Sequence, residues 1–193
     1  MKTGSEHNPE GLSSEELVIR ITITKQTGLF EILYDRHVKA IYNRCLSFTN
    51  DVAAAEDLTH DIFVKAYINL SKFNRQSKFF TWLYSIAYNH CVDFQTKKLR
   101  QSSIFESYDD VVVDEGPSDN EVFRIQYDRL NGLLNDLSIE ERSLLLMKYQ
   151  DSMPIKEIIK VTGLKESAIK MRLKRTKEKL LNSYQSKYKH NIY

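Results

Sequence analysis

The sequence predicts an all-α protein built from two small helical domains. Only six glycines and three prolines occur among its 193 residues, and apolar residues recur at helical spacing through most of the chain. This period is lost between residues 101 and 120, around Gly116 and Pro117, which indicates a flexible acidic linker. We therefore expect one domain over residues 13–100, the linker over 101–120, and a second domain over 121–186.

The first domain is expected to contain four helices. Apolar residues between positions 13 and 47 indicate a short helix followed by a long one. Asn50 and Asp51 can cap a third helix, whose apolar stripe continues to Leu70. A polar loop over residues 71–78 then leads to a fourth helix, over about residues 79–98, which is rich in aromatic residues at its start.

The second domain is expected to contain four more helices. The first covers about residues 121–135, and the second begins at a capping box formed by Ser138 and Glu141. Pro154 suits the first turn of the third helix, where a missing N–H costs little. Gly163 ends that helix, because glycine readily adopts the left-handed conformation that other residues resist. A strongly basic fourth helix follows, so the last two helices form a helix-turn-helix pattern, in which the second helix lies in the DNA major groove.

Charge is distributed unevenly along the chain, although the net charge is only +2. From Lys156 to the C-terminus there are 11 Lys and Arg residues against 3 Asp and Glu. Residues 101–123 hold 7 acidic residues and no Lys or Arg. A basic helical segment suits a phosphate backbone, whereas the acidic segment would be repelled by DNA. The alternative for the basic segment is two ordinary amphipathic helices with a solvated face.

Other features of the sequence exclude several classes of protein. Cys45 and Cys91 lack the spacing of a disulfide framework or a zinc site, so we expect them to pack as small apolar groups in a reducing compartment. There is no apolar run of 18 residues and no signal peptide, so we expect a cytoplasmic protein without membrane insertion. We expect no metal, no cofactor and no catalytic residue.

The third predicted helix carries a mostly acidic outer surface. Its apolar stripe faces a core and leaves four polar side chains outside: Glu56, Asp57, His60 and Asp61. Such charges fit a solvated surface, and they would equally suit docking against a partner protein.

The fourth predicted helix holds more aromatic residues than a core requires. The expected core residues are Trp82, Leu83, Ile86, Ala87 and Phe94. The surplus aromatic residues are Phe79, Phe80, Tyr84 and Tyr88. Aromatic rings beside basic groups stack on unpaired bases, although such a stripe also occurs in ordinary cores.

Polar residues flank this helix on both sides. The preceding loop is a candidate pocket for an extruded base, formed by Phe73, Asn74, Arg75 and Gln76. Three cations close the helix: Lys97, Lys98 and Arg100. Cations at this end complement the helix dipole, and they could equally hold a DNA backbone.

In their order and spacing, these segments resemble the sigma factors of bacterial RNA polymerase, specifically the extracytoplasmic-function (ECF) subfamily of the sigma-70 family. The resemblance covers about residues 27–100 and 121–184. Region two of that family is similar to LYDRH, AEDLTHDIF, FTWLYSIAYNH and DFQTKK, and region four to LNDLSIEERSLLLMKY and the helix-turn-helix. The resemblance implies a subunit that binds core RNA polymerase and promoter DNA and directs promoter-specific initiation, while the polymerase performs the chemistry.

The resemblance also implies a role for each candidate residue. Docking on the clamp helices of the largest polymerase subunit is implied for Asp57, His60, Asp61 and Phe63. Capture of a flipped base of the −10 element, with contacts to nearby phosphates, is implied for Phe73, Asn74, Arg75, Gln76, Tyr88, Asn89, Lys97, Lys98 and Arg100. Reading of the −35 bases is implied for Lys170, Met171, Lys174 and Arg175, and phosphate contact for Lys165, Ser167 and Arg172. Lys and Arg pair well with guanine edges, whereas methionine offers only an apolar contact.

Three places depart from the usual family pattern. His60 and Asp61 stand where Gln and Glu are common, Ile159 stands where a small Ala is usual, and Lys165 replaces a frequent Ser or Pro. Further partners implied by the family are the polymerase flap and an anti-sigma factor, and we expect the free protein to be a monomer.

Two other functions stay open from the sequence alone. A helix-turn-helix regulator would bind operator DNA without polymerase, but it would leave the aromatic segment of the first domain unused. A metal-dependent phosphohydrolase of the HD type would use His60 and Asp61 with His37 and Asp93. Two adjacent ligand types are weak support for the second function, because a metal site needs a converging cluster.

Overall fold

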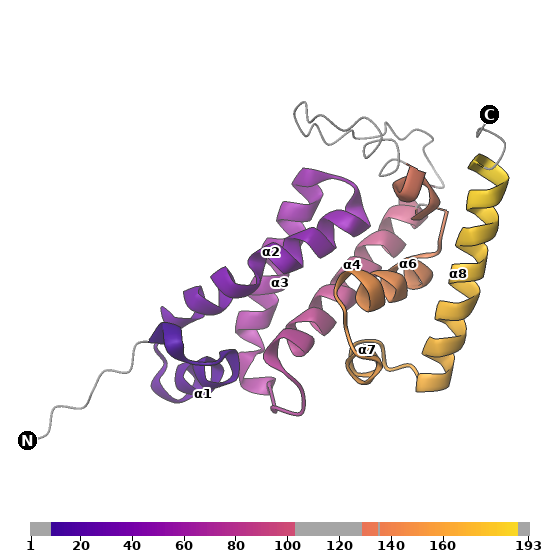
Figure 1. Ribbon diagram of the computed structural model, residues 1–193. Helices are drawn as coiled ribbons and strands as arrows, with labels where there is room; N and C mark the ends of the chain where they lie inside the picture. The colour runs from indigo at the N-terminus through magenta and orange to yellow at the C-terminus, as the bar shows by residue number, and fades with distance from the viewer. Residues whose placement is uncertain (1–8, 103–128, 135, 189–193) are drawn as a thin grey trace, which may run out of the picture. The chain divides into compact units, whose positions relative to one another are not determined.

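The computed structural model describes residues 9–102, 129–134 and 136–188, with side chains up to Lys98 in the first stretch (Figure 1). These residues form helices and no strand, so the predicted all-α fold is confirmed. The chain divides into two compact units, residues 1–105 and 106–193, which we describe separately. Nearly all of the predicted linker lies outside the described residues. No helix in the described stretches is both long and apolar enough to span a membrane.

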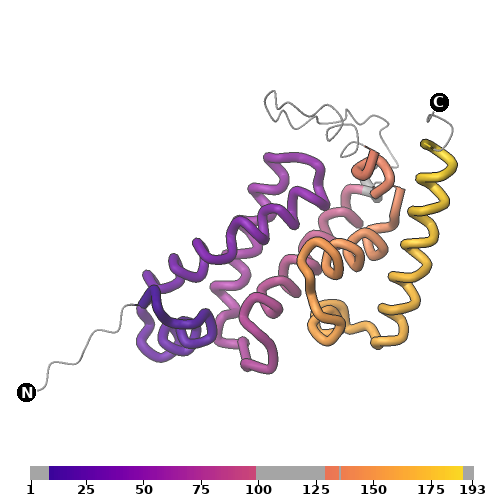
Figure 2. Tube along the Cα trace, in the orientation of Figure 1, coloured from indigo at the N-terminus to yellow at the C-terminus, as the bar shows by residue number. Residues whose placement is uncertain are grey.

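The first unit is a bundle of three long helices with a shorter helix packed against it (Figure 2). Its elements in chain order are η1 (Pro9–Gly11), α1 (Ser14–Thr24), α2 (Leu29–Thr49), α3 (Val52–Ile68), η2 (Leu70–Lys72) and α4 (Phe79–Ser102). Helices α2, α3 and α4 contact one another pairwise, and α1 contacts α2, η2 and α4.

Local capping defines where the first helices begin and end. Ser13 and Glu16 form a capping box at the start of α1, with the Glu16 carboxylate accepting from the Ser13 amide at 2.7 Å. Asn50 adopts a left-handed conformation, with φ of 50°, and ends α2. Asp51 then starts α3, because its carboxylate accepts from the Ala54 amide at 2.9 Å. This short connection turns α2 and α3 into an antiparallel hairpin.

The face of α4 that enters the core differs from the predicted one. Phe79, Leu83, Ala87 and Cys91 lie at i, i+4 spacing and are fully buried, and Tyr84 joins them with 1% exposure. The residues predicted for the core were Trp82, Ile86 and Phe94 besides Leu83 and Ala87, and these three are only half-buried. The prediction that Phe79 and Tyr84 are surplus to the core was therefore wrong. The small side chains Ala87 and Cys91 allow α4 to approach α2 and α3, which selects this stripe.

Two polar features are built into this core. The buried Arg44 guanidinium lies 5.3 Å from the centre of the Tyr84 ring, a cation–π arrangement. Cys45 and Cys91 are both free and buried, with their sulfur atoms 3.9 Å apart. The Cys91 thiol donates a hydrogen bond to the Cys45 sulfur, and this contact and burial together raise the pKa of the Cys91 thiol. Both cysteines therefore pack inside the bundle, as predicted.

The second unit contains the predicted helix-turn-helix. Its described elements are a helical stretch over residues 129–134, α6 (Ile139–Leu145), the π-helical turn η3 (Leu146–Gln150), α7 (Ile155–Thr162) and α8 (Glu166–Tyr188). Only the end of the helix predicted over residues 121–135 is described. The core of this unit consists of Leu133, Leu144, Leu145, Met147, Met153, Ile158, Val161, Ile169 and Leu173.

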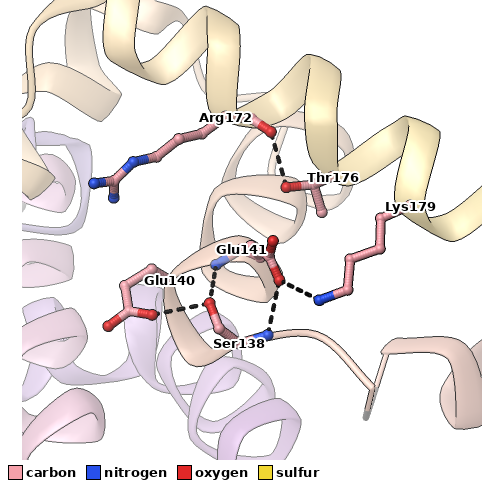
Figure 3. A network of polar contacts seen from close by, with 6 residues as sticks. All are labelled: Ser138, Glu140, Glu141, Arg172, Thr176 and Lys179. Carbon is pink, nitrogen blue, oxygen red and sulfur yellow. Dashed lines mark hydrogen bonds and ion pairs between the residues drawn. The ribbon is translucent and has the colours of Figure 1, made fainter.

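Polar contacts fix α6 against α8 (Figure 3). Ser138 and Glu141 form the predicted capping box, in which the Ser138 amide donates to Glu141 Oε2 at 3.0 Å. The same carboxylate oxygen accepts from Lys179 Nζ at 2.9 Å, so one glutamate caps α6 and holds α8. These two contacts lower the pKa of the Glu141 carboxyl. The outer face of α8 is thus positioned from behind by α6.

The turn between α7 and α8 depends on Gly163. It caps α7 in the left-handed conformation at φ of 70°, and its amide donates to the Ile159 carbonyl at 2.8 Å, as the sequence predicted. Ile158 and Val161 are buried, whereas Ile159 is half-buried. Ile159 is larger than the alanine that is usual at this position in the family that the sequence resembles, and its extra volume lies at the margin of the α7 packing.

Replacing Gly163 with alanine is expected to destabilise the second unit by about 1–2 kcal/mol. Nothing lies within 4 Å of a Cβ added there, so the cost is backbone strain and not a clash. Unfolding in denaturant, followed by far-UV circular dichroism, measures the change. Gly132→Ala is the matched control, since it replaces a helical glycine with a nearest contact of 3.8 Å and should instead stabilise by about 0.5–1 kcal/mol. Equal effects of the two substitutions would contradict this account of the turn.

Candidate nucleic-acid interface

Helix α8 presents a basic outer face opposite its buried face. Ile169, Leu173 and Thr176 are buried and fix the orientation of the helix. The predicted base-reading residues are all exposed on the other sides: Lys170, Met171, Lys174 and Arg175. The predicted phosphate contacts Lys165, Ser167 and Arg172 are exposed as well. The structure therefore brings the whole predicted −35 set onto the accessible surface of one helix and the turn before it.

The three cationic residues among these base-reading candidates, Lys170, Lys174 and Arg175, differ in their ion pairs. Lys170 Nζ lies 2.5 Å from Glu166 Oε1, and Lys174 Nζ lies 3.9 Å from Glu178 Oε1. The ammonium group of Lys170 lowers the pKa of the Glu166 carboxyl. Among the described residues no ion pair engages Arg175. It can therefore meet a base edge without first leaving a carboxylate.

The aromatic residues at the start of α4 hold the polar loop before it. Phe73 is 8% exposed, and its ring centre lies 5.8 Å from that of Phe79 and 5.6 Å from that of Trp82. Phe79 and Trp82 are themselves 5.7 Å apart, so the three rings form a cluster that joins the two ends of the loop. Phe73 was predicted to line a base pocket, but its burial makes it a support for the loop instead.

The middle of the loop is exposed and polar. Asn74, Arg75 and Gln76 are all exposed. The Gln76 amide donates to Asn74 Oδ1 at 3.2 Å, which forms a local turn. Arg75 has φ of 61°, a conformation that is uncommon outside glycine and requires support from the surrounding structure.

The remaining −10 candidates follow along α4. Asn89 and Lys97 are exposed, while Tyr88 and Lys98 are half-buried. Arg100 lies in α4, but its side chain is outside the described part of the structure. Asn89 is therefore the most accessible of the predicted residues in the middle of this helix.

Helix α3 presents the predicted acidic surface. Asp57, His60 and Asp61 are exposed, and Asp61 Oδ2 lies 3.6 Å from His90 Nε2 on α4. Exposed apolar residues follow on the same helix: Val64, Tyr67 and Ile68, which is 71% exposed. Phe63 is only 3% exposed and packs against Phe30 and Tyr34, so it was wrongly assigned to the contact surface and instead supports α3 from within.

One residue considered for a phosphohydrolase site, His37, has other partners. His37 Nε2 lies 3.0 Å from Ser14 Oγ, and its ring lies 5.5 Å from that of Phe79. Burial, with a smaller contribution from Arg36, lowers the pKa of His37. In the described parts of the chain, no three His, Cys, Asp or Glu side chains gather as metal ligands would.

One contact at the start of α4 could not be predicted from the sequence. Glu15 of α1 accepts a hydrogen bond from the Phe79 backbone amide at 2.6 Å, although 64 residues separate the two. By contrast, the pairing of Glu166 with Lys170 at i, i+4 could have been predicted from helical spacing alone.

The helix-turn-helix formed by α7 and α8 has a buried inner face and an exposed basic outer face. These two features define a DNA-binding protein of the helix-turn-helix class.

Comparison with known families identifies the class more closely. Residues 33–101 match the Sigma-70 region 2 family, and residues 127–180 match the Sigma-70 region 4 family. Together these matches cover more than half of the chain, which therefore belongs to the sigma-70 family. The resemblance inferred from the sequence is confirmed.

Several similar curated proteins belong to one subfamily. The chain is 26% identical over 161 residues to the ECF RNA polymerase sigma factor SigW of Bacillus subtilis, covering 78% of this chain and 86% of SigW. It is 25% identical to the ECF sigma factor SigM of Bacillus subtilis, covering 79% of this chain and 93% of SigM. It is also 26% identical to the ECF sigma-E factor of Haemophilus influenzae, covering 91% and 97%. The chain is an ECF sigma factor, which directs promoter-specific transcription.

Solved structures share the fold. The sigma factor RpoE, in complex with the anti-sigma factor NepR from Bartonella quintana, aligns with a TM-score of 0.66 and 21% identity, covering 79% of this chain and 94% of RpoE. CnrH, in complex with the cytosolic domain of CnrY, aligns with a TM-score of 0.65 and 22% identity, covering 89% and 97%.

Proposed function

We propose that the two units of this sigma factor hold promoter DNA in two different ways. The domain over residues 121–186 binds the duplex −35 element through α8, and the domain over residues 13–100 captures an unpaired base of the −10 element. The observation that carries this proposal is the exposed polar loop held on an aromatic cluster, because a protein that binds only duplex has no use for it.

In binding to the −35 element, the outward residues of α8 would fall into two groups, those that contact bases and those that contact phosphates. Arg175, Lys174 and Lys170 would pair with guanine edges, and Met171, at 54% exposure, would make an apolar contact such as one with a thymine methyl. Lys165, Ser167 and Arg172 would contact phosphates and so position the helix without reading sequence.

In capturing the unpaired −10 base, the loop over residues 71–78 and α4 would act together. Asn74, Arg75 and Gln76 would surround the extruded base, and Asn89 would hydrogen-bond to it. Tyr88 would stack beside it, and Lys97, Lys98 and Arg100 would hold the adjacent phosphates.

The acidic surface of α3 would dock on core RNA polymerase. Asp57, His60 and Asp61 supply charge complementarity, and the exposed Val64 and Ile68 supply apolar area beside it. The polymerase performs the chemistry, in the cytoplasm, and this chain contributes no catalytic residue. The anti-sigma factor NepR, named with the RpoE structure, supports an anti-sigma partner for this chain.

Replacing Asn89 with alanine is expected to leave duplex −35 binding unchanged and to reduce promoter opening about tenfold. The reason is that a lost hydrogen bond to the flipped base removes about 1–1.5 kcal/mol from the open complex only. The measurement is permanganate reactivity of unpaired thymines, in the holoenzyme, on a promoter selected from a random library.

The matched control for this prediction is Asn43→Ala. Asn43 is also an exposed helical asparagine of the first unit, but it lies on α2. It should not change opening. An equal loss of promoter opening in both variants, or a loss of duplex binding in Asn89→Ala, would contradict the assignment of Asn89 to the −10 element.

A further inference from the structure

One carboxylate of helix α1, that of Glu15, contacts the backbone where the polar loop ends and α4 begins. Phe79 begins α4, and its amide donates to Glu15 Oε1 at 2.6 Å. The first turn of α4 contains no acidic residue of its own. A carboxylate on the free N–H groups at a helix start is stabilising, because it meets both an unsatisfied donor and the positive end of the helix dipole. In this protein that cap comes from a different helix.

The same helix also reaches the entrance of the loop. A cavity of about 170 Å³ lies between α1 and the loop, with walls that include Val18, Ile19, Thr22, Leu70, Phe73 and Arg75. Helix α1 also packs against η2 (Leu70–Lys72) at the entrance of the loop, so it contacts both ends of the segment that carries Asn74, Arg75 and Gln76.

Helix α1 is itself firmly placed. Leu17, Val18 and Ile21 are buried, so the helix is docked on the bundle. The Arg36 guanidinium of α2 donates to the carbonyls of Glu10 and Leu12, both at 2.6 Å, just before α1 begins. A helix held in this way can impose its position on the loop that it contacts.

The loop needs such support for the task proposed for it. Arg75 is held at φ of 61°, and a backbone in that region persists only where its surroundings determine it. A loop that is already ordered before binding loses less entropy when it closes on a base. Fixing the start of α4 sets where the loop ends and where Asn89, further along α4, is presented.

We infer that Glu15 is a positioning residue for −10 capture: its carboxylate fixes the start of α4 and so orders the loop over residues 71–78. Glu15 lies outside the residues matched to the Sigma-70 region 2 family, which begin at 33. The inference rests on the proposed function of the loop in capturing an unpaired base.

The test compares single-stranded −10 binding by holoenzymes that carry Glu15→Ala, Glu15→Gln or Glu16→Ala. Glu15→Ala should weaken binding of a non-template-strand oligonucleotide roughly tenfold, the scale of one lost charge-assisted hydrogen bond. Glu15→Gln keeps an accepting oxygen, so it should recover most of the affinity. Glu16→Ala is the matched control, because Glu16 closes the α1 capping box without a contact to the loop. It should leave binding unchanged, and −35 duplex binding should be unchanged in all three.

A second readout follows the loop without DNA. The chain has a single tryptophan, Trp82, which lies in the ring cluster at the loop ends. Glu15→Ala should shift the Trp82 emission and increase its quenching by iodide, while far-UV circular dichroism stays at the wild-type value. Unchanged emission in Glu15→Ala would overturn the inference.

Three further outcomes are decisive. If Asn74→Ala weakens oligonucleotide binding but Glu15→Ala does not, the inference is overturned and the proposed function stands. If Glu15→Ala and Glu16→Ala lose affinity equally, the effect belongs to the stability of α1 and the inference is also overturned. If Asn74→Ala and Gln76→Ala both bind as wild type, the proposed function of the loop fails, and the inference fails with it.

Discussion

Replacing Phe79 with alanine is expected to destabilise the first unit by about 3–5 kcal/mol, a large fraction of the stability of a small domain. Phe79 is fully buried, and its ring contacts those of Phe73, Trp82 and His37. Removing the ring leaves a cavity where the two ends of the polar loop meet. We therefore expect loss of −10 binding together with loss of stability.

The measurement is unfolding in denaturant, with Trp82 fluorescence reporting on the first unit, which contains the only tryptophan. The second unit should keep its own transition in circular dichroism, because two units need not unfold as one. Phe80→Ala is the matched control, since Phe80 is half-buried and should cost clearly less. A loss below about 1 kcal/mol in Phe79→Ala would contradict the core position of this ring.

Replacing Arg175 with alanine is expected to lower −35 affinity by about 1–3 kcal/mol and to relax the preference for one base pair. Arg175 is exposed, on the side of α8 away from the buried Leu173, and no ion pair with a described residue competes for it. Lys170→Ala should cost less, because Glu166 already pairs with Lys170 and would have to release it.

The matched control for Arg175 is Arg172, an exposed arginine on the same helix. As a phosphate contact, Arg172→Ala should weaken all duplexes about equally and reduce the salt slope of binding by about 1. Titration of a duplex and its single-base variants at several salt concentrations separates the two effects. If Arg175→Ala weakens every variant equally, Arg175 contacts phosphate and the assignment is wrong.

Features set by neighbouring residues could be predicted from the sequence. The capping box of Ser138 and Glu141, the cap at Asp51 and the left-handed Gly163 all depend on local backbone chemistry, and all occur as expected. The outward face of α8 could likewise be predicted, because Ile169 and Leu173 fix its orientation by their spacing.

Features set by tertiary packing could not. Periodicity marks α4 as amphipathic, but an aromatic-rich helix offers several apolar stripes, and only contact with α2 and α3 selects the one through Phe79 and Leu83. For the same reason Phe63 and Phe73 were predicted as contact residues and proved to be buried. The bond between Glu15 and Phe79 joins residues far apart in the chain, which no local pattern encodes.

Transcription with core RNA polymerase and a library of promoter fragments tests the proposed promoter recognition most directly. With this chain added, we expect initiation from a defined subset of fragments that share a −35 and a −10 element. Arg175→Ala should change the selected −35 bases, and Asn89→Ala should reduce opening at the same promoters. Failure of the chain to bind core polymerase, or initiation that does not depend on the chain, would contradict its role in promoter recognition.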